Sequence, residues 1–121
     1  MTDLTKIEVW NLSLELAATV YQMLKSDVFE RDFSFRDQMR RAAISIPSNI
    51  AEGLDSGFDK LGVRFFYIAK GSAAELQTQV LLAEKIAYWS PEECKLVLSE
   101  LEIIVKKLNK LIAYRKSQYT K

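Results

Sequence analysis

The side chains that most often perform catalysis are scarce in this sequence. It contains no histidine and a single cysteine, Cys94. Without histidine there is no His-based zinc site, no His-containing di-iron motif and no Ser-His-Asp triad. Acid pairs such as Glu92 with Glu93 and Asp55 with Asp59 stand where helices are expected to begin, and carboxylates there complement the helix dipole. The sequence therefore predicts no catalytic residue, no metal site, no cofactor and no enzymatic activity.

Six cations on two predicted helices could instead bind phosphate groups. They are Arg40, Arg41, Lys106, Lys107, Lys110 and Arg115. Two interpretations of the arginines remain open, because one of them could form a buried ion pair with Glu75 or Glu52 that fixes the packing register, or both could face a phosphate. The lysines of the last helix, which no acid follows after Glu102, either meet the helix dipole in solvent or form a contact surface for RNA or DNA.

Hydrophobic periodicity predicts four helices that would position these cations. The chain has 121 residues, 49% of them hydrophobic, and only 4 glycines and 2 prolines, which fits one domain over 1–121 without a many-stranded sheet. Apolar residues recur every three or four positions over about 7–25, 35–52, 58–88 and 91–115, whereas 26–34 is expected to be a loop. Four helices with short connections favour an all-α, antiparallel up-down-up-down four-helix bundle.

Local signals predict where these helices bend, stop and begin. Pro47 lies inside the second helix, where it removes a backbone donor, so a kink or break is expected near it. Gly53 is expected to end that helix. Ser90 and Glu93 have the spacing of a capping box at the start of the last helix. The core-facing residues of the third helix are expected to be Phe66, Ala69, Ala73, Leu76, Val80, Ala83 and Ala87, and those of the last Cys94, Val97, Leu101, Ile104, Leu108 and Leu111.

The first helix carries two apolar sets, which is more apolar surface than one face of a bundle normally uses. One set consists of Trp10, Leu14, Ala17, Tyr21 and Leu24, and the other of Val9, Leu12, Leu16, Val20 and Met23. Either the helix lies in a thick core, or the second set faces sister subunits. The second interpretation predicts an oligomer interface at Val9, Leu12, Leu16, Val20 and Met23.

The overall charge and the first residues exclude several partners. The 17 Lys and Arg nearly balance the 16 Asp and Glu, so the net charge of +1 argues against a histone-like nucleic-acid coat and a polybasic membrane binder. The segment Met1–Lys6 lacks the basic and apolar regions of a signal peptide, and no stretch of about 18 apolar residues is present. We therefore expect no membrane partner, and an unpaired cysteine favours a cytoplasmic location.

Three segments in the same order resemble the 23S rRNA-intervening sequence proteins, also called the four-helix-bundle protein family. They are Glu8–Trp10, Gln38–Gly53 and Phe65–Leu76, and the most specific part reads Arg-Arg-Ala-Ala-Ile-Ser-Ile-Pro-Ser-Asn-Ile-Ala-Glu-Gly from Arg40 to Gly53. The accessory variability determinant of diversity-generating retroelements is similar. The resemblance implies a bundle protomer that forms a ring-like homopentamer without enzymatic activity. In retroelement members it also implies a basic surface for nucleic acid and a reverse transcriptase as partner.

Two departures favour the intervening-sequence branch of this family. The chain is nearly neutral, whereas retroelement members are strongly basic, and Leu54–Ser56 follows the central motif where many members continue with arginines. Two hypotheses follow. The chain is an adaptor or assembly factor that contacts RNA, DNA or a nucleic-acid-processing protein. Alternatively, it is a purely structural or protein-binding oligomer with no nucleic-acid role.

Overall fold

The structure is a computed structural model that describes residues 1–120, so Lys121 of the C-terminal tail lies outside it. The described residues form helices and connections and contain no strand, which confirms the predicted all-α class. The elements are the 3-10 helix η1 (Leu4–Lys6) and the α-helices α1 (Glu8–Met23), α2 (Asp27–Arg31), α3 (Phe33–Leu54), α4 (Asp59–Lys85) and α5 (Pro91–Tyr119).

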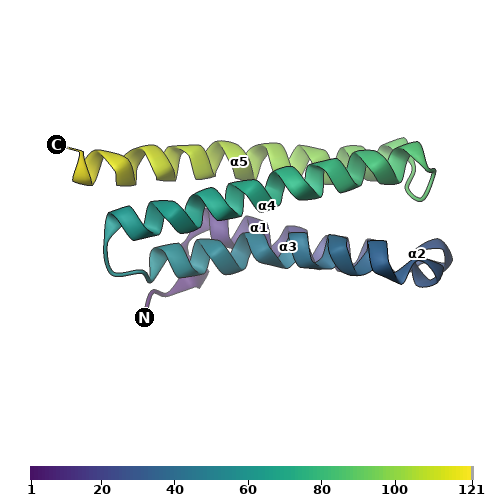
Figure 1. Ribbon diagram of the computed structural model, residues 1–121, viewed down its shortest axis with the longest axis horizontal. Helices are drawn as coiled ribbons and strands as arrows, with labels where there is room; N and C mark the ends of the chain where they lie inside the picture. The colour runs from purple at the N-terminus through teal and green to yellow at the C-terminus, as the bar shows by residue number, and fades with distance from the viewer. Residues whose placement is uncertain (121) are drawn as a thin grey trace.

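The four long helices pack around a common core. Helix α3 packs against α4, α4 against α5, and α1 against both α3 and α5. Figure 1 shows α3, α4 and α5 running side by side, with the chain reversing its direction at each connection and both termini at the same end. The short α2 lies at the opposite end, where it joins α1 to α3. As a consequence, the first half of α4 lies beside the second half of α5.

The core-facing residues of α4 and α5 follow the predicted spacing closely. On α4 the six residues from Phe66 to Ala83 in that series are buried, and on α5 the series from Cys94 to Leu108 is buried as well. Two positions at the ends differ. Ile112 takes the last core position of α5 in place of Leu111, which is only partly buried. Ala87 is exposed because α4 has already ended.

The segment 26–34 is not the predicted loop, because it contains α2 and the first residues of α3. Phe29 of α2 is fully buried, and its ring lies 5.1–5.7 Å from the rings of Phe35, Tyr88 and Trp89. Asp32 caps α3 by accepting a hydrogen bond from the backbone N–H of Phe35 at 3.4 Å. The aromatic cluster closes this end of the bundle and stabilises a helical turn that has too few residues to show periodicity.

Helix α3 continues through both positions that were predicted to disturb it. It is unbroken at Pro47, which is buried, so the expected break is absent while the kink remains a prediction. Gly53 does not end the helix but is buried inside its last turn. A Cβ atom at Gly53 would lie 2.8 Å from Phe66 Cδ1, and one at Gly62 would lie 2.8 Å from the carbonyl oxygen of Gly53. These glycines therefore allow α3 and α4 to approach closely.

The connection between α4 and α5 contains one confirmed and one missed signal. The predicted capping box is present, since Ser90 N–H donates to Glu93 Oε1 at 2.9 Å and Glu93 N–H donates to Ser90 Oγ at 3.1 Å. Helix α4 ends at Lys85 instead of residue 88. Ala87 has a left-handed φ of 60°, and Tyr88 N–H donates to Ala83 O at 2.8 Å, which is the pattern of a Schellman cap. The usual glycine is missing from this cap, so the sequence did not indicate it.

Candidate nucleic-acid interface

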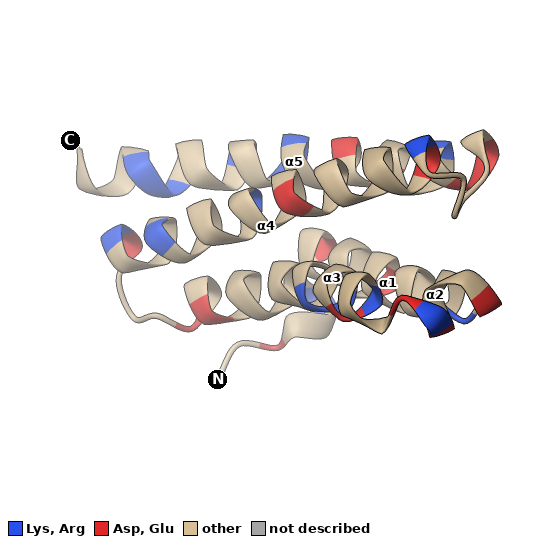
Figure 2. Ribbon diagram, turned by 45° about the vertical axis from the view of Figure 1, so that its right-hand side comes forward, with Lys and Arg blue, Asp and Glu red and all other residues tan. Residues whose placement is uncertain are grey.

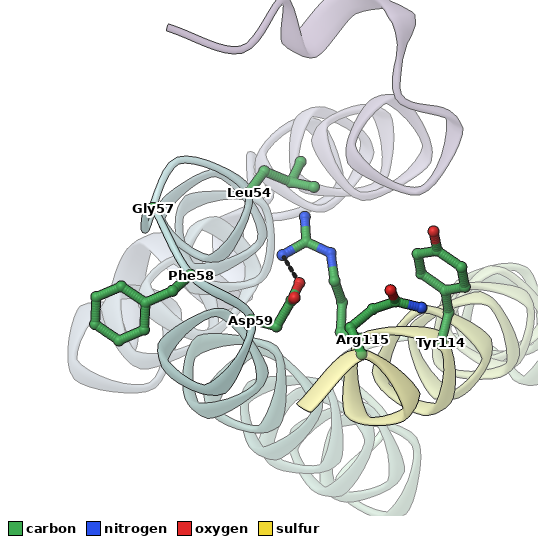
Figure 3. A pocket seen from close by; sticks show the side chains of 7 residues that line it. Leu54, Gly57, Phe58, Asp59, Tyr114 and Arg115 are labelled. Atoms are coloured by element: carbon green, nitrogen blue, oxygen red, sulfur yellow. Dashed lines mark ion pairs between the residues drawn. The ribbon is translucent and has the colours of Figure 1, made fainter. Parts of the chain in front are cut away.

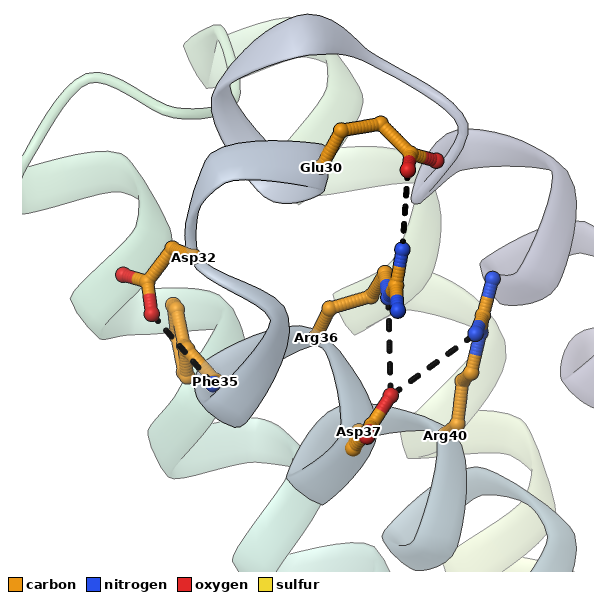
Figure 4. A network of polar contacts seen from close by, with 6 residues as sticks. All are labelled: Glu30, Asp32, Phe35, Arg36, Asp37 and Arg40. Atoms are coloured by element: carbon orange, nitrogen blue, oxygen red, sulfur yellow. Dashed lines mark hydrogen bonds and ion pairs between the residues drawn. The ribbon is translucent and has the colours of Figure 1, made fainter.

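Arg40 belongs to a polar network near the junction of α2 and α3 (Figure 4). Its Nη1 atom lies 3.7 Å from Asp37 Oδ1, and its guanidinium stands 5.3 Å from the centre of the Tyr21 ring on α1. Asp37 also pairs with Arg36, which reaches Glu30 of α2 at 3.0 Å. The predicted partners Glu75 and Glu52 were therefore wrong for Arg40. Its contacts join α3 to α1, and its side chain is 27% exposed.

Arg41 points to a different surface from Arg40. It lines a hollow of about 410 Å³ between α3 and α4, together with Phe33, Asp37 and Glu75. Arg41 is exposed, and the ion pairs of residues 1–120 do not include it. The structure thus separates the two arginines that the sequence treated as one candidate phosphate site.

Three of the four candidate cations on α5 already have acidic partners. Lys106 Nζ lies 3.3 Å from Glu102 Oε1, and Lys107 pairs with Glu8 of α1. Arg115 Nη1 lies 3.4 Å from Asp59 Oδ1, at the start of α4, and its guanidinium stands 5.5 Å from the centre of the Phe66 ring.

Figure 3 shows the Arg115–Asp59 ion pair in a hollow of about 440 Å³ at the end of the bundle. Tyr114 lies on one side of this hollow, and Phe58 points away from it. The Arg115 side chain is 20% exposed, so Arg115 connects α5 to α4 more than it faces solvent. Lys110 is exposed and forms none of the ion pairs within residues 1–120.

The structure adds cations from α4 that sequence reasoning missed. Because the first half of α4 lies beside the second half of α5, Lys60, Arg64 and Lys70 join the lysines of α5. In Figure 2 several blue segments of both helices lie toward the end that holds the C-terminus, while those at the opposite end stand among red segments. We define the basic end as Lys60, Arg64, Lys70, Lys106, Lys110 and Lys116. The sequence predicted two long antiparallel helices in succession. That prediction already implies that cations early in α4 and cations late in α5 lie at the same end of the bundle.

A surface groove runs between α4 and α5 beside the basic end. It has a volume of about 530 Å³, and Lys70 and Lys106 stand among the residues that line it. Its apolar lining consists of Ala73, Ala74, Leu98, Leu101 and Val105. Beyond the groove, Lys116 of α5 meets Tyr67 of α4, with Lys116 Nζ 3.5 Å from Tyr67 Oη and 5.8 Å from the centre of the ring.

The predicted oligomer interface on α1 is largely turned inward. Val9, Leu16 and Val20 are buried in the core of the protomer, and Leu12 and Met23 pack against that core while partly exposed. The expectation that this set forms an outer apolar face is therefore wrong for the three buried residues.

The interior face of α1 also includes a polar residue, Ser13. It is 1% exposed, and its hydroxyl donates to Trp10 O at 2.8 Å. Leu14 of the other set is 43% exposed. Because Ser13 satisfies its own hydroxyl within the helix, it can occupy a core position that an apolar pattern skips.

Cys94 is a core residue, as expected from its position on α5. Its thiol is buried and lies 3.6 Å from Val80 O, and burial raises the pKa of this thiol. Within residues 1–120 no group of three or more His, Cys, Asp or Glu residues could hold a metal ion. Over the same residues, no helix is both long and apolar enough to cross a membrane.

These features define an all-α protein in which four long helices surround one core and a basic end lies on α4 and α5. The chain belongs to the 23S rRNA-intervening sequence protein family, whose model matches residues 5–110. The predicted family is thus confirmed, while a link to retroelements remains a prediction.

The fold is shared with a crystal structure described as a protein with unknown function from the S23 ribosomal protein family of Bacteroides thetaiotaomicron. The TM-score is 0.79 at 24% sequence identity, over 86% of this chain and 97% of the other. No curated protein matches the sequence.

Proposed function

We propose that this chain is a noncatalytic, oligomeric helical-bundle protein that contacts RNA or DNA through its basic end. The observation that carries the proposal is that cations from two helices, α4 and α5, lie at the same end of the bundle. Lys60, Arg64 and Lys110 are exposed there and form none of the ion pairs within residues 1–120. From residue 103 to residue 120 the chain carries lysines and one arginine but no acid. Phosphate groups would therefore meet little repulsion there.

The proposed assembly is a ring-like homopentamer of single-domain protomers covering 1–121. Each protomer would be an antiparallel up-down-up-down bundle with α3 kinked near Pro47. Large apolar side chains exposed on separate helices support self-association, among them Ile44, Leu82 and Ile103 at 42–48% exposure. A ring would multiply the few cations of each protomer. Light scattering should then give a mass above that of the monomer at micromolar concentration, and a monomeric mass would contradict the assembly.

Nucleic-acid binding can be tested by fluorescence anisotropy with labelled RNA at two salt concentrations. Affinity should fall with salt at a log–log slope of about −0.7 for each phosphate contact on a single strand. The variant Lys106→Glu/Lys110→Glu should reduce affinity at least tenfold.

The matched control is Lys85→Glu/Lys95→Glu, which makes the same change in net charge at the opposite end of α4 and α5. Both control lysines are exposed. Its affinity should stay within about threefold of wild type. Equal losses in both variants would show a general charge effect, and no binding at low salt would remove the proposal.

A second candidate function is a purely structural or protein-binding oligomer. It is favoured by the ion pairs of Arg40, Lys106, Lys107 and Arg115, because a cation that already has an acidic partner has less to gain from a phosphate. Under this alternative the partners are proteins without a nucleic-acid role, whereas a nucleic-acid-processing protein, including a reverse transcriptase if the chain is linked to a retroelement, belongs to the first candidate function. The same titration separates the two candidates, since the second predicts no RNA binding at low salt.

A further inference from the structure

We infer that the groove between α4 and α5 binds a single strand of nucleic acid, with one base stacked on the ring of Tyr67. This inference rests on the proposed nucleic-acid function and names the class of strand and the residue that distinguishes it from a duplex. Three observations carry it: the environment of the Tyr67 ring, the lining of the groove, and the sign of the charges along its edges.

The Tyr67 ring is held at the surface instead of being packed in the core. It is 46% exposed, and a cation of α5, Lys116, stands over it. A partly exposed ring with a neighbouring cation has the two properties of a stacking platform, an aromatic surface for a base and a positive charge for the adjoining phosphate. Stacking on an aromatic side chain depends little on base identity, so this contact predicts weak sequence preference.

On α4 the groove begins at Lys70, about one turn beyond Tyr67, and extends from there toward the middle of the bundle. Tyr67, Lys70, Ala74 and Gln77 recur at steps of three and four and therefore lie on one face of the helix, and the last three line the groove. From Tyr67 to Gln77 the helix rises about 15 Å, at about 1.5 Å per residue. A stacked strand carries one phosphate about every 3.4 Å, so the stretch from Tyr67 to the far end of the groove has room for about four nucleotides.

The charges beside the groove favour a polyanion with apolar faces. Lys70 and Lys106 line it, and Lys116 stands beyond its end at Tyr67. The acid on its lining, Glu102, is paired with Lys106 at 3.3 Å. Unpaired bases would cover the apolar lining while their phosphates met the lysines. A duplex exposes phosphates, sugars and base edges but no free base face, because its bases are stacked and paired inside.

The test compares a labelled 12-mer of uridine with a 12-base-pair RNA duplex, both titrated against the full chain at low salt. Tyr67→Ala should weaken binding of the single strand at least fivefold and that of the duplex less than twofold. Tyr67→Phe keeps the ring and should bind like wild type. Tyr114→Ala is the matched control, because Tyr114 of α5 is 63% exposed but lines the hollow at the end of the bundle and not the groove.

A second variant, Ala74→Leu, fills the groove without changing charge and keeps the test independent of Tyr67. It should also weaken binding of the single strand selectively. In addition, a 4-thiouridine strand should crosslink to the α4 segment that contains Tyr67. Equal effects of Tyr67→Ala on both nucleic acids, or wild-type binding of the single strand by Ala74→Leu, would overturn the inference. If Ala74→Leu alters only the oligomer mass, the occupant is a second copy of the chain and the inference is also wrong.

The proposed function can fail separately from this inference. If Lys106→Glu/Lys110→Glu reduces binding of both nucleic acids while Tyr67→Ala affects neither selectively, the basic end binds nucleic acid without a stacking site. If neither nucleic acid binds the wild-type chain at low salt, the proposed function is wrong, and the inference falls with it.

Discussion

Two glycines of the bundle should respond in opposite directions to the same substitution. Gly53 is buried in the last turn of α3, whereas Gly71 is exposed in the middle of α4. A Cβ atom at Gly71 would meet no atom within 4 Å. A Cβ atom at Gly53 would lie 2.8 Å from Phe66 Cδ1 and 3.0 Å from the carbonyl oxygen of Gly62. We expect Gly71→Ala to stabilise the protein and Gly53→Ala to destabilise it.

The magnitudes follow from helix propensity and from the space available. Alanine in place of glycine in a helix interior is worth about 0.5–1 kcal/mol, and Gly71→Ala should gain this fully. For a chain of this size the gain corresponds to a rise in melting temperature of roughly 2–6 °C. Gly53→Ala gains the same propensity but must displace a ring and a backbone oxygen, and overpacking of this kind costs about 1–3 kcal/mol. The midpoints of these two ranges give a net loss of about 1 kcal/mol, with an upper limit of about 2.5 kcal/mol.

Urea unfolding followed by circular dichroism measures both effects at fixed protein concentration. A double-mutant cycle sharpens the test, because Phe66→Leu removes the ring that Cβ of residue 53 would strike. The Gly53→Ala substitution should then cost less in the Phe66→Leu background, with a coupling of at least about 0.5 kcal/mol. If Gly53→Ala is as stable as wild type, or if the two substitutions are additive, the close approach of α3 and α4 at Gly53 is wrong.

Three further predictions concern single sites. Ala87 has a left-handed φ of 60°, so Ala87→Gly should stabilise the chain by up to about 1 kcal/mol in urea unfolding, and a loss of stability would contradict the cap. The Cys94 thiol, whose pKa is raised by burial, should react with a disulfide reagent at neutral pH only after unfolding, and rapid reaction of the native chain would be inconsistent with its position. Hydrogen bonds from the Thr2 hydroxyl and backbone N–H lower the pKa of Asp55, so its ionised form favours the folded state. This stabilisation should be present above the ordinary pKa of the carboxyl and be lost as the pH falls, and an NMR titration that gives Asp55 an ordinary pKa would refute it.

Several features of the fold could be predicted because each depends on a short stretch of chain. The spacing of Phe66, Leu76 and Val80 indicated both a helix and its buried face, and these residues are buried. The capping box of Ser90 and Glu93 involves two residues three positions apart, and both of its hydrogen bonds are present. The motif from Arg40 to Gly53 was specific enough to identify the family.

Other local readings failed where tertiary packing competed with a local signal. Gly53 resembled a helix stop, but its missing side chain serves the approach of α4 instead. Ser13 interrupted the apolar pattern of α1, yet a hydrogen bond within the helix lets it face the core beside Leu16. The sequence left two positions open for the set containing Leu16, a thick core or a subunit interface, and the packing of α1 against α3 and α5 turns Leu16 inward.

The sequence by itself determined the helical class, the family and the scarcity of catalytic side chains, since these follow from residue types and from spacings within one helix. The tertiary structure alone decided which cations are free and which lie together. Lys60 and Lys110 are fifty positions apart in sequence but belong to one basic end, because α4 and α5 pack side by side in opposite directions. Arg115, by contrast, is paired with Asp59 of α4. Charges act through distance in space, and only the packing of the helices sets that distance.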